Sequence, residues 1–397
     1  MADDTYVLDL LVTGADAVSV IDDGSGIDTI RVNGIYTETI VIDLAWIVSN
    51  GTPMTAGSTY VSDDSKSRTL TIFGTIENAC GSNGSDSITG NALANLLCGD
   101  RKPTGAGLSD TLLGGGGNDS LFGGAGQDQV WGGADDDAIW GDAGNDVIDA
   151  GSGRDTVAGG SGADVLDGGG DLGDTLSYAA SRRGVVVALQ DNAVTLARRG
   201  DAEGDRITGF TAVIGSKAKD QITMVDKTPE ASANEIHGGG GSDRIATGGG
   251  NDLAYGGTDN DVMTAEMGDD SLWGDGGADR LSGGYGQDML TGGTEADQFI
   301  FNAPLDSTVL GPDLITDFHS ADLDRIILTS VDADLGLAGN QAFRLITGAF
   351  TGQAGELVTR ADGDMTQILG DTNGDGQPDF LILVQAVLTL TEADFSL

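Results

Sequence analysis

Aspartates recur every nine residues over two long stretches of the sequence, and this spacing is the feature best suited to chemistry. From Gly114 to Leu166 the chain repeats the pattern G-G-x-G-x-D-x-U-x, in which U is apolar, and a second array from Gly238 to Ile300 follows the same rule. Such repeats combine carboxylates with the carbonyl oxygens of glycine-rich turns. An oxygen-only ligand set of this kind suits the flexible coordination of Ca²⁺ better than the tight octahedron of Mg²⁺.

The candidate calcium ligands are the aspartates at the sixth position of each unit, with one added residue before Asp174 and a return to phase at Asp220. They are Asp86, Asp110, Asp119, Asp128, Asp137, Asp146, Asp155, Asp164, Asp174, Asp220, Asp243, Asp252, Asp261, Asp270, Asp279, Asp288 and Asp297. If each ion lies between loops of successive coils on the same edge, we expect about ten ions or more. Ten Ca²⁺ would move the formal net charge from −44 to about −24.

An apolar residue follows each aspartate two positions later, which predicts a very short strand that buries one side chain. A single unit cannot bury that side chain alone, so units must stack, with two units forming one coil. Coils then stack at the strand spacing of about 4.8 Å. The sequence therefore predicts an all-β fold: a right-handed parallel β-roll, or β-solenoid, with β caps at both ends. A disordered Gly/Asp-rich linker is the alternative, and it does not explain the strict phase of the apolar residues.

The composition adds a strong charge imbalance. The 397 residues include 63 Asp and Glu against 19 Lys and Arg. Carboxylates in stacked columns repel one another unless a cation intervenes, so the arrays are expected to be unfolded without metal. The charge argues against nucleic acid and anionic membranes as partners. No apolar run is long enough for a membrane span, and the acidic beginning MADDTYVLDLLV is not expected to be a conventional signal peptide.

Composition and phase divide the chain into five predicted segments. Residues 1–71 are predicted to form an N-terminal β cap that begins the roll, with a separate small β-domain as the alternative. Residues 72–177 form a first repeat block and 228–300 a second. The segment 178–227 is basic and is expected to contain coils with few ions; its charges either form a solvated face or dock an acidic surface of a neighbouring copy. Residues 301–397 are predicted to cap the roll at its C-terminal end.

Cys80 and Cys98 both occupy the ninth position of their units and lie one coil apart. Their Cα atoms are expected to be about 5 Å apart, within the range of a disulfide. We predict this bridge because they are the only two cysteines and the compartment is expected to be oxidising. Two free thiols in register are the alternative.

Outward aromatic residues are also one coil apart. Phe122 lies eighteen residues before Trp140, and Tyr255 eighteen before Trp273, so each pair is expected to stack on an outer face.

The two arrays resemble the hemolysin-type calcium-binding repeats of RTX (repeats-in-toxin) proteins, which form a parallel β-roll. Residues 301–397 resemble the C-terminal domain of serralysin-type proteases. That resemblance implies a domain that closes the roll and carries an uncleaved signal for type I secretion machinery. The final Asp394-Phe395-Ser396-Leu397 is similar to the acidic-then-apolar end of that signal.

A further candidate ion site lies in this C-terminal segment. Asp371, Asn373 and Asp375 form a D-x-N-x-D-G pattern typical of calcium loops. Position 12 of the loop is Ile382 instead of the bidentate Glu of an EF-hand. Calcium binding and a tight hairpin turn both remain open interpretations.

No established catalytic motif is present in the sequence. His237 and His319 are the only histidines, and they belong to no H-E-x-x-H motif; a G-x-S-x-G elbow is also absent. Protease and lipase chemistry are therefore not expected, and the repeats account for the paired aspartates that a glycosidase would otherwise suggest.

The function expected from these features is that of a secreted, calcium-binding structural protein. It would fold on extracellular Ca²⁺ at the bacterial cell surface or in the medium, as a non-catalytic surface-layer, matrix or adhesive protein. Self-association or a surface polysaccharide would supply its partner. Two alternatives stay open: an accessory module or enzyme acting on acidic polysaccharide, similar to mannuronan epimerases, and a carrier for secretion and folding of a partner.

Overall fold

The computed structural model describes residues 5–9, 29–33, 59–62, 69–71, 78–81, 85–100, 108–190, 193–226, 228, 231–386 and 388–397. These residues form two compact units and contain no α-helix. The first unit comprises Met1–Ser181 and Asn192–Phe210, and the second comprises Arg182–Asp191 and Thr211–Leu397.

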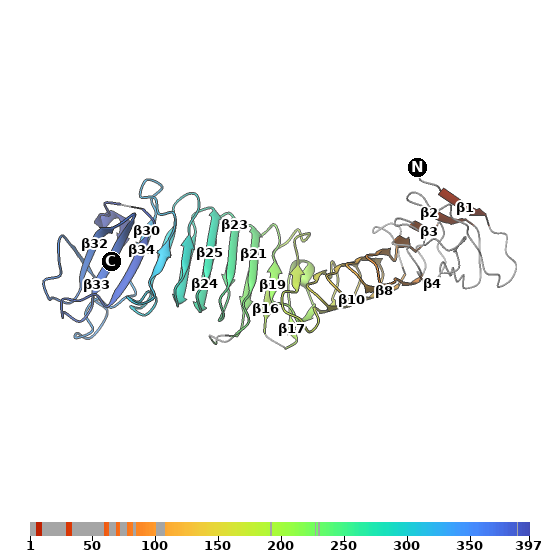
Figure 1. Ribbon diagram of the computed structural model, residues 1–397, viewed down its shortest axis with the longest axis horizontal. Coiled ribbons are helices and arrows are strands. Elements are labelled where there is room, and N and C mark those ends of the chain that lie inside the picture. Colours follow the sequence, from red (N-terminus) through yellow and green to blue (C-terminus); the bar gives the residue numbers. More distant parts are fainter. Residues whose placement is uncertain are drawn as a thin grey trace. The chain divides into compact units, whose positions relative to one another are not determined.

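The first unit is a coil of short parallel strands in two sheets. One sheet stacks β5 (Asn78–Cys80), β7 (Leu96–Cys98), β9 (Ser120–Ala125), β11 (Ala138–Ala143), β13 (Thr156–Ala158) and β15 (Thr175–Ser177). The other stacks β4 (Thr69–Thr71), β6 (Ser87–Thr89), β8 (Thr111–Gly116), β10 (Gln129–Ala134), β12 (Val147–Ser152), β14 (Val165–Asp167) and β18 (Arg206–Thr208). Figure 1 shows these strands as successive short arrows.

From residue 111 to residue 167 the chain crosses from one sheet to the other every nine residues, so each strand there pairs with the strand eighteen residues later. Val130, for example, lies beside Leu112 on one side and Ile148 on the other. All three side chains are 0–1% exposed. The one apolar residue of every unit thus forms the core, as the period-two alternation of a strand requires.

Further strands extend the first unit at each end. At the N-terminal side, β1 (Thr5–Asp9), β2 (Thr29–Asn33) and β3 (Thr59–Ser62) pair in parallel with one another, and β3 pairs with β5. Most of the predicted N-terminal cap otherwise lies outside the described residues. At the other end, the short strand β17 (Thr195–Leu196) pairs antiparallel with β18, followed by a 3₁₀ turn at Gly200–Ala202.

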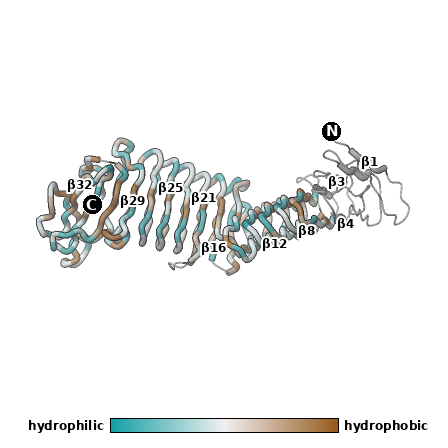
Figure 2. Tube along the Cα trace, viewed as in Figure 1, coloured by the Kyte–Doolittle hydropathy of each residue, from teal (hydrophilic) through white to brown (hydrophobic). Residues whose placement is uncertain are grey.

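The second unit repeats this architecture. One sheet stacks β19 (Ala212–Ile214), β21 (Glu235–Gly240), β23 (Leu253–Thr258), β25 (Ser271–Gly276), β27 (Met289–Thr291) and β29 (Asp313–Ile315). The other, which we call sheet C, stacks β16 (Val186–Leu189), β20 (Gln221–Met224), β22 (Arg244–Ala246), β24 (Val262–Met267), β26 (Arg280–Tyr285), β28 (Gln298–Ile300), β30 (Arg325–Ile327) and β35 (Phe395–Ser396). Figure 2 shows hydrophobic and hydrophilic segments alternating along this part of the tube.

The C-terminal segment continues the second unit with antiparallel as well as parallel strand pairs. Strand β34 (Phe380–Val384) pairs in parallel with β29, and antiparallel pairs join β34 to β33 (Met365–Asp371) and β33 to β32 (Glu356–Asp362). Strand β31 (Arg344–Ile346) pairs in parallel with β32. A 3₁₀ turn at Glu392–Asp394 precedes β35. The fold is therefore all-β, and its repeats form a parallel β-roll, as the sequence predicts.

Glycine is required where one coil approaches the next. Gly144, at the fourth position of its unit, has φ +154°. A Cβ there would overlap the carbonyl oxygen of Gly126 in the preceding coil. Any side chain at this position would push the coils apart, which explains why the turns are built of glycine.

Candidate calcium sites

The predicted ligand aspartates lie in ladders along the edges of the roll. Within the first unit, the backbone N–H of Asp110 donates to Oδ1 of Asp128 at 2.7 Å, and that of Asp128 donates to Oδ1 of Asp146 at 2.8 Å. The same bond recurs at each step, so each carboxylate fixes the loop of the preceding coil. One edge carries Asp86, Asp110, Asp128, Asp146, Asp164 and Asp205, and the other carries Asn95, Asp119, Asp137, Asp155 and Asp174.

The second unit has the same two ladders. The N–H of Asp252 donates to Oδ1 of Asp270 at 2.8 Å, and that of Asp270 donates to Oδ1 of Asp288 at 2.9 Å. One edge carries Asp220, Asp243, Asp261, Asp279, Asp297 and Asp324, and the other carries Asn234, Asp252, Asp270, Asp288 and Asp313. The structure thus places the repeat aspartates in four columns, two in each unit.

The second carboxylate oxygen of these aspartates has no hydrogen-bond donor. Oδ2 is buried and unpartnered at Asp110, Asp119, Asp128, Asp137, Asp146, Asp155, Asp164, Asp174, Asp243, Asp252, Asp261, Asp270, Asp279, Asp288 and Asp297. A buried carboxylate oxygen without a partner is strongly unfavourable, and proteins normally pair such groups or use them to bind metal. Fifteen such atoms in register therefore indicate one recurring unmet interaction.

Backbone carbonyl oxygens converge on the same points. A Cβ built on Gly114 would fall against both Asp119 Oδ2 and the carbonyl oxygen of Gly132, and Gly274 faces Asp279 Oδ2 and the Gly292 carbonyl in the same way. Carboxylate and carbonyl oxygens together are the ligands that Ca²⁺ prefers. No three His, Cys, Asp or Glu side chains gather at one point among the described residues. One carboxylate from each loop, completed by carbonyls, fits the calcium set that the sequence predicts.

Burial also changes the acidity of the ladder. Removal from water, reinforced by the charges of neighbouring aspartates, raises the pKa of Asp146 and of Asp270 to about 8. The same cause raises the pKa of Asp137 to about 7. At Asp146 and Asp270 the metal-free carboxylate therefore favours its protonated form near neutral pH, whereas a bound cation requires the ionised form.

Because the pKa values of ladder aspartates are raised, the stability of the roll should fall with rising pH in the absence of calcium and increase with rising pH in its presence. In chelator, the folded pKa of Asp146, about 8, exceeds the ordinary value of 3.8. The stability that the folded state gains from holding a proton on Asp146 is complete below about pH 4 and is lost as the pH rises through about 8. In calcium, protons compete with the ion, so the apparent calcium affinity should fall as the pH drops through the same window. Circular dichroism across calcium titrations at several pH values will measure both trends; an affinity independent of pH between about 5 and 8 would contradict this account.

Protein donors occupy the second oxygen at three ladder ends. The Tyr178 hydroxyl donates to Oδ2 of Asp205 at 2.9 Å, and the His319 N–H donates to Oδ2 of Asp324 at 2.7 Å. At Asp220, Oδ2 accepts the N–H of Ser216. These three carboxylates belong to the same ladders as the others. Their Oδ2 atom, however, accepts a hydrogen bond from the protein, whereas Oδ2 of the other ladder aspartates has no donor. Asp220 is thus a ladder member whose carboxylate is already hydrogen-bonded.

Asp205, Asp313 and Asp324 are ladder residues that the nonapeptide rule does not identify, because insertions separate them from the regular arrays. Each is buried and begins the sequence D-x-U, as in Asp324-Arg325-Ile326. The tetrad D-x-U-x, without the preceding glycines, is the signal that could have identified them.

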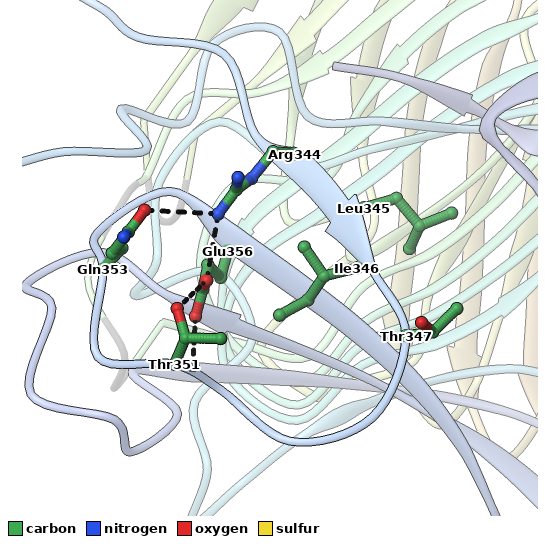
Figure 3. A pocket seen from close by; sticks show the side chains of 7 residues that line it. All are labelled: Arg344, Leu345, Ile346, Thr347, Thr351, Gln353 and Glu356. Carbon is green, nitrogen blue, oxygen red and sulfur yellow. Dashed lines mark hydrogen bonds and ion pairs between the residues drawn. The ribbon is translucent and has the colours of Figure 1, made fainter.

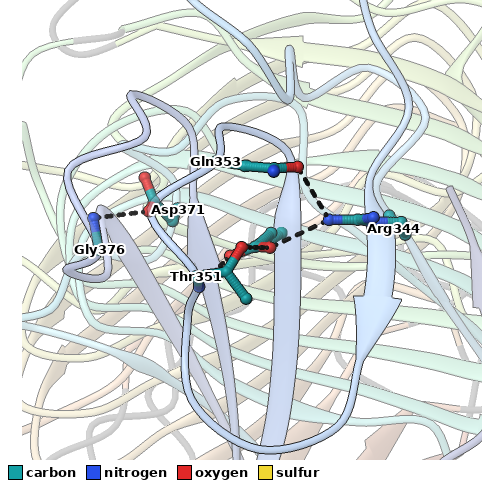
Figure 4. A network of polar contacts seen from close by, with 6 residues as sticks. Arg344, Thr351, Gln353, Asp371 and Gly376 are labelled. Carbon is teal, nitrogen blue, oxygen red and sulfur yellow. Dashed lines mark hydrogen bonds and ion pairs between the residues drawn. The ribbon is translucent and has the colours of Figure 1, made fainter.

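The predicted loop at Asp371, Asn373 and Asp375 is a turn closed by its own side chains. Asp371 Oδ1 accepts the N–H of Gly374 at 2.6 Å, and its Oδ2 accepts the N–H of Gly376 at 2.9 Å (Figure 4). Asn373 Nδ2 donates to Oδ1 of Asp379, and Asn373 Oδ1 accepts the N–H of Asp375. These contacts form a tight turn; calcium binding here remains a prediction.

Cys80 and Cys98 lie directly opposite each other on β5 and β7, and both are free thiols. A hydrogen bond to the Cys98 side chain lowers the pKa of the Cys80 thiol, so the two sulfur atoms are neighbours. The bridge remains a prediction. Protein purified from an oxidising medium should show no free thiol and a mass two hydrogens lower than after reduction. Cys80→Ser serves as the control, since it leaves one titratable thiol.

The predicted aromatic ladders are present on the outer faces. Phe122 stacks on Trp140 with ring centroids 4.6 Å apart, and Tyr255 stacks on Trp273 at 4.7 Å. His237 extends the second stack at 4.6 Å from Tyr255, and its Nε2 lies 2.9 Å from Glu235 Oε1. The sequence did not identify this role, although His237 is one coil before Tyr255. His319 lies in a turn before β30.

A separate open depression lies in the C-terminal segment, with a volume of about 630 Å³ (Figure 3). At its base Glu356 is fully buried, and its carboxylate accepts the N–H of Thr351 at 2.6 Å and Arg344 Nη2 at 3.0 Å. Hydrogen bonds from Thr351, with the charge of Arg344, lower the pKa of Glu356. The carboxylate is therefore a fixed structural anchor for the loop that joins β31 to β32.

Comparisons with known proteins match two parts of the chain. Residues 104–139 and 140–171 match the RTX calcium-binding nonapeptide repeat, and residues 229–397 match the C-terminal domain of peptidase M10 serralysin. A comparison with curated proteins gave no match. None of the described residues forms a helix long and apolar enough to cross a membrane.

Two solved structures are similar to part of the chain. They are solution structures of the R3 and R2 subunits of a mannuronan C5-epimerase from Azotobacter vinelandii. The R3 subunit has 23% identity and a TM-score of 0.21, with coverage of 46% of this chain and 80% of its own. The R2 subunit has 27% identity and a TM-score of 0.22, with coverage of 46% and 91%.

Proposed function

We propose that this chain, an RTX calcium-binding repeat protein with a serralysin-type C-terminal domain, is a secreted structural protein that folds on extracellular calcium and has no catalytic role. The observation that carries the proposal is the register of fifteen buried Oδ2 atoms without a donor. Their free energy cost favours an unfolded chain wherever calcium is scarce, and calcium binding reverses it. The chain would therefore stay unfolded in the cytosol and fold after export.

The ions would be held by the repeat aspartates within 72–177 and 228–300, where the carbonyls of glycine turns complete the ligand set. A count of about ten or more follows if each ion bridges two loops of the same edge. The C-terminal domain would direct export by type I secretion machinery. The segment 178–227 would connect the two blocks with few ions.

A structural role at the cell surface, as part of a surface layer, matrix or adhesive coat, is supported by the aromatic side chains on the outer faces of the sheets. Outward aromatics such as Trp140 and Trp273 are half-buried on these faces and offer contact surface. The carboxylate of Glu356 in the C-terminal depression is hydrogen-bonded through both oxygens, which favours a structural role for it.

The test is a calcium titration of the purified chain, followed at once by circular dichroism and by light scattering. We expect β structure to form before the particle mass rises, with both changes in the same range of calcium concentration. A folded protein that stays strictly monomeric in calcium would contradict assembly while leaving calcium folding intact. Fractionation of producing cells, with recovery of the protein only in the cytosol, would contradict export.

A further inference from the structure

Two adjacent columns of side chains on the outer side of sheet C in the second unit contain no acidic residue, although the whole chain has a net charge of −44. Each strand from β16 to β30 contributes one residue to each column, and β24 continues beyond both columns to the partly exposed Glu266 near its end. From β20 to β30 the pairs are Gln221 and Thr223, Arg244 and Ala246, Val262 and Thr264, Arg280 and Ser282, Gln298 and Ile300, and Arg325 and Ile327. Arginines are therefore the only charged residues in these two columns.

Arg244, Arg280 and Arg325 belong to one column of this face. Strand pairing aligns Arg244 with Val262, Val262 with Arg280, Arg280 with Gln298, and Gln298 with Arg325. The three arginines thus recur on every second strand, roughly 10 Å apart along a straight line. All three side chains are exposed. We call this column the arginine row.

Within the described part of the chain, the guanidinium groups of Arg244 and Arg280 face no carboxylate in an ion pair, and that of Arg325 acts on a carboxylate only through its charge. None of the three forms an ion pair among the described residues, and the side-chain contact recorded for Arg280 is its hydrogen bond to Gln298 Oε1. The carboxylate that the charge of Arg325 acts on is Asp394, which lies opposite it beside β35; this carboxylate is buried, and its Oδ2 already accepts hydrogen bonds from Thr391. Their bidentate donor sets are thus open to an external anion.

Several exposed carboxylates of the second unit lie in the turns between strands. Asp259 lies between β23 and β24, Asp269 between β24 and β25, and Glu295 between β27 and β28. A thick polyanion such as duplex nucleic acid would meet these acidic turns and be repelled. A slender anionic chain can lie along the arginine row without touching them.

We propose that the arginine row binds a linear anionic polysaccharide, aligned along the stacking direction of the strands. An extended sugar chain places its carboxylate or sulfate groups at regular intervals along a line, which matches a row of guanidinium groups. The half-buried hydroxyls of Thr223 and Thr264, in the neighbouring column, are available to sugar hydroxyls. The inference goes beyond calcium-dependent assembly and requires only that calcium has folded the second unit.

The test uses the full-length, calcium-loaded protein and short oligogalacturonides, with binding measured by isothermal titration calorimetry. Replacing all three arginines (R244Q, R280Q and R325Q) should weaken binding by about tenfold or more, because charge-assisted contacts are lost. Arg206→Gln is the matched control. Arg206 occupies the same repeat position on β18 of the first unit and is exposed. Its neighbour on β14 is Val165 and it is not part of a row of arginines, so the loss of Arg206 should leave binding unchanged.

Oligosaccharides of chondroitin sulfate distinguish sulfate from carboxylate as the preferred anion, and either preference supports the proposal. Wild-type protein that binds neither glycan at low salt overturns it, as does a triple variant that binds as well as wild type. Stronger binding to single-stranded DNA than to both glycans also overturns it. Loss of self-association by the triple variant, with no glycan binding by wild type, would assign the face to a second copy.

Circular dichroism in calcium, recorded before glycan is added, separates this result from a failure of calcium folding. If the triple variant does not fold, Arg280→Gln alone tests the central position. A loss of about threefold is then expected, with recovery by Arg280→Lys limited because lysine cannot form the bidentate contact. Unchanged binding by a folded Arg280→Gln protein would overturn the proposal.

Discussion

Excess chelator should unfold the repeats of both units. Fifteen buried carboxylate oxygens have no donor, and the ladders align them in columns, so without a cation each column combines desolvation cost with mutual repulsion. We expect far-UV circular dichroism to show a largely disordered chain in chelator and a β-rich one in millimolar Ca²⁺, with a large increase in melting temperature. The transition should be steep in calcium concentration, because each coil stabilises the next.

Magnesium is the control for this experiment. Carbonyl-rich loops suit the larger and more flexible coordination sphere of Ca²⁺, so Mg²⁺ at equal concentration should restore little structure. A chain with the same β spectrum and melting temperature in chelator as in calcium would show that the ladders are stable unaided, and the proposed role of the cation would fail.

Asp137→Asn should weaken calcium-dependent folding far more than Asp136→Asn, although the two residues are adjacent. Asp137 is buried, its Oδ1 accepts the N–H of Asp119, and its Oδ2 has no donor. Asparagine retains an acceptor for that N–H but replaces the charged ligand. We expect the calcium concentration at the folding midpoint to rise by roughly threefold to tenfold, because loops on both sides lose a carboxylate ligand.

Asp136 supplies the matched control. It is exposed, and its Oδ1 accepts the N–H of Arg154, a bond that asparagine can also accept. The change in formal charge is identical in the two variants, so a general electrostatic effect would shift both midpoints equally. Equal midpoints for the two variants would therefore remove Asp137 from the proposed ligand set.

The regular part of the fold could be predicted from the sequence because the spacing of the repeat specifies how its units stack. A nine-residue period with one apolar residue in fixed phase leaves one way to bury Leu121, Ile139 and Val157, which is to stack them in neighbouring coils. The same phase placed the aspartates on the edges and Phe122 over Trp140. Periodicity also gave the register of Cys80 and Cys98.

The irregular positions could not be predicted in this way. Asp205 joins the ladder of Asp164 across forty-one residues, after an insertion that breaks the period. Its capping by Tyr178 depends on how that insertion folds back, and no local pattern encodes it. The anchoring of Glu356 by Thr351 and Arg344 likewise depends on a loop conformation.

The sequence alone determined that this chain is a calcium-type β-roll, because spacing and residue type are sufficient when every unit has the same neighbours. The tertiary structure alone decided which carboxylate oxygens lack a partner, which ladder ends the protein satisfies itself, and which face carries aligned arginines. Those properties depend on the contacts between coils of unequal length. Arg280 and Arg325 are forty-five residues apart in the sequence, and only the pairing of β26, β28 and β30 places them in one row.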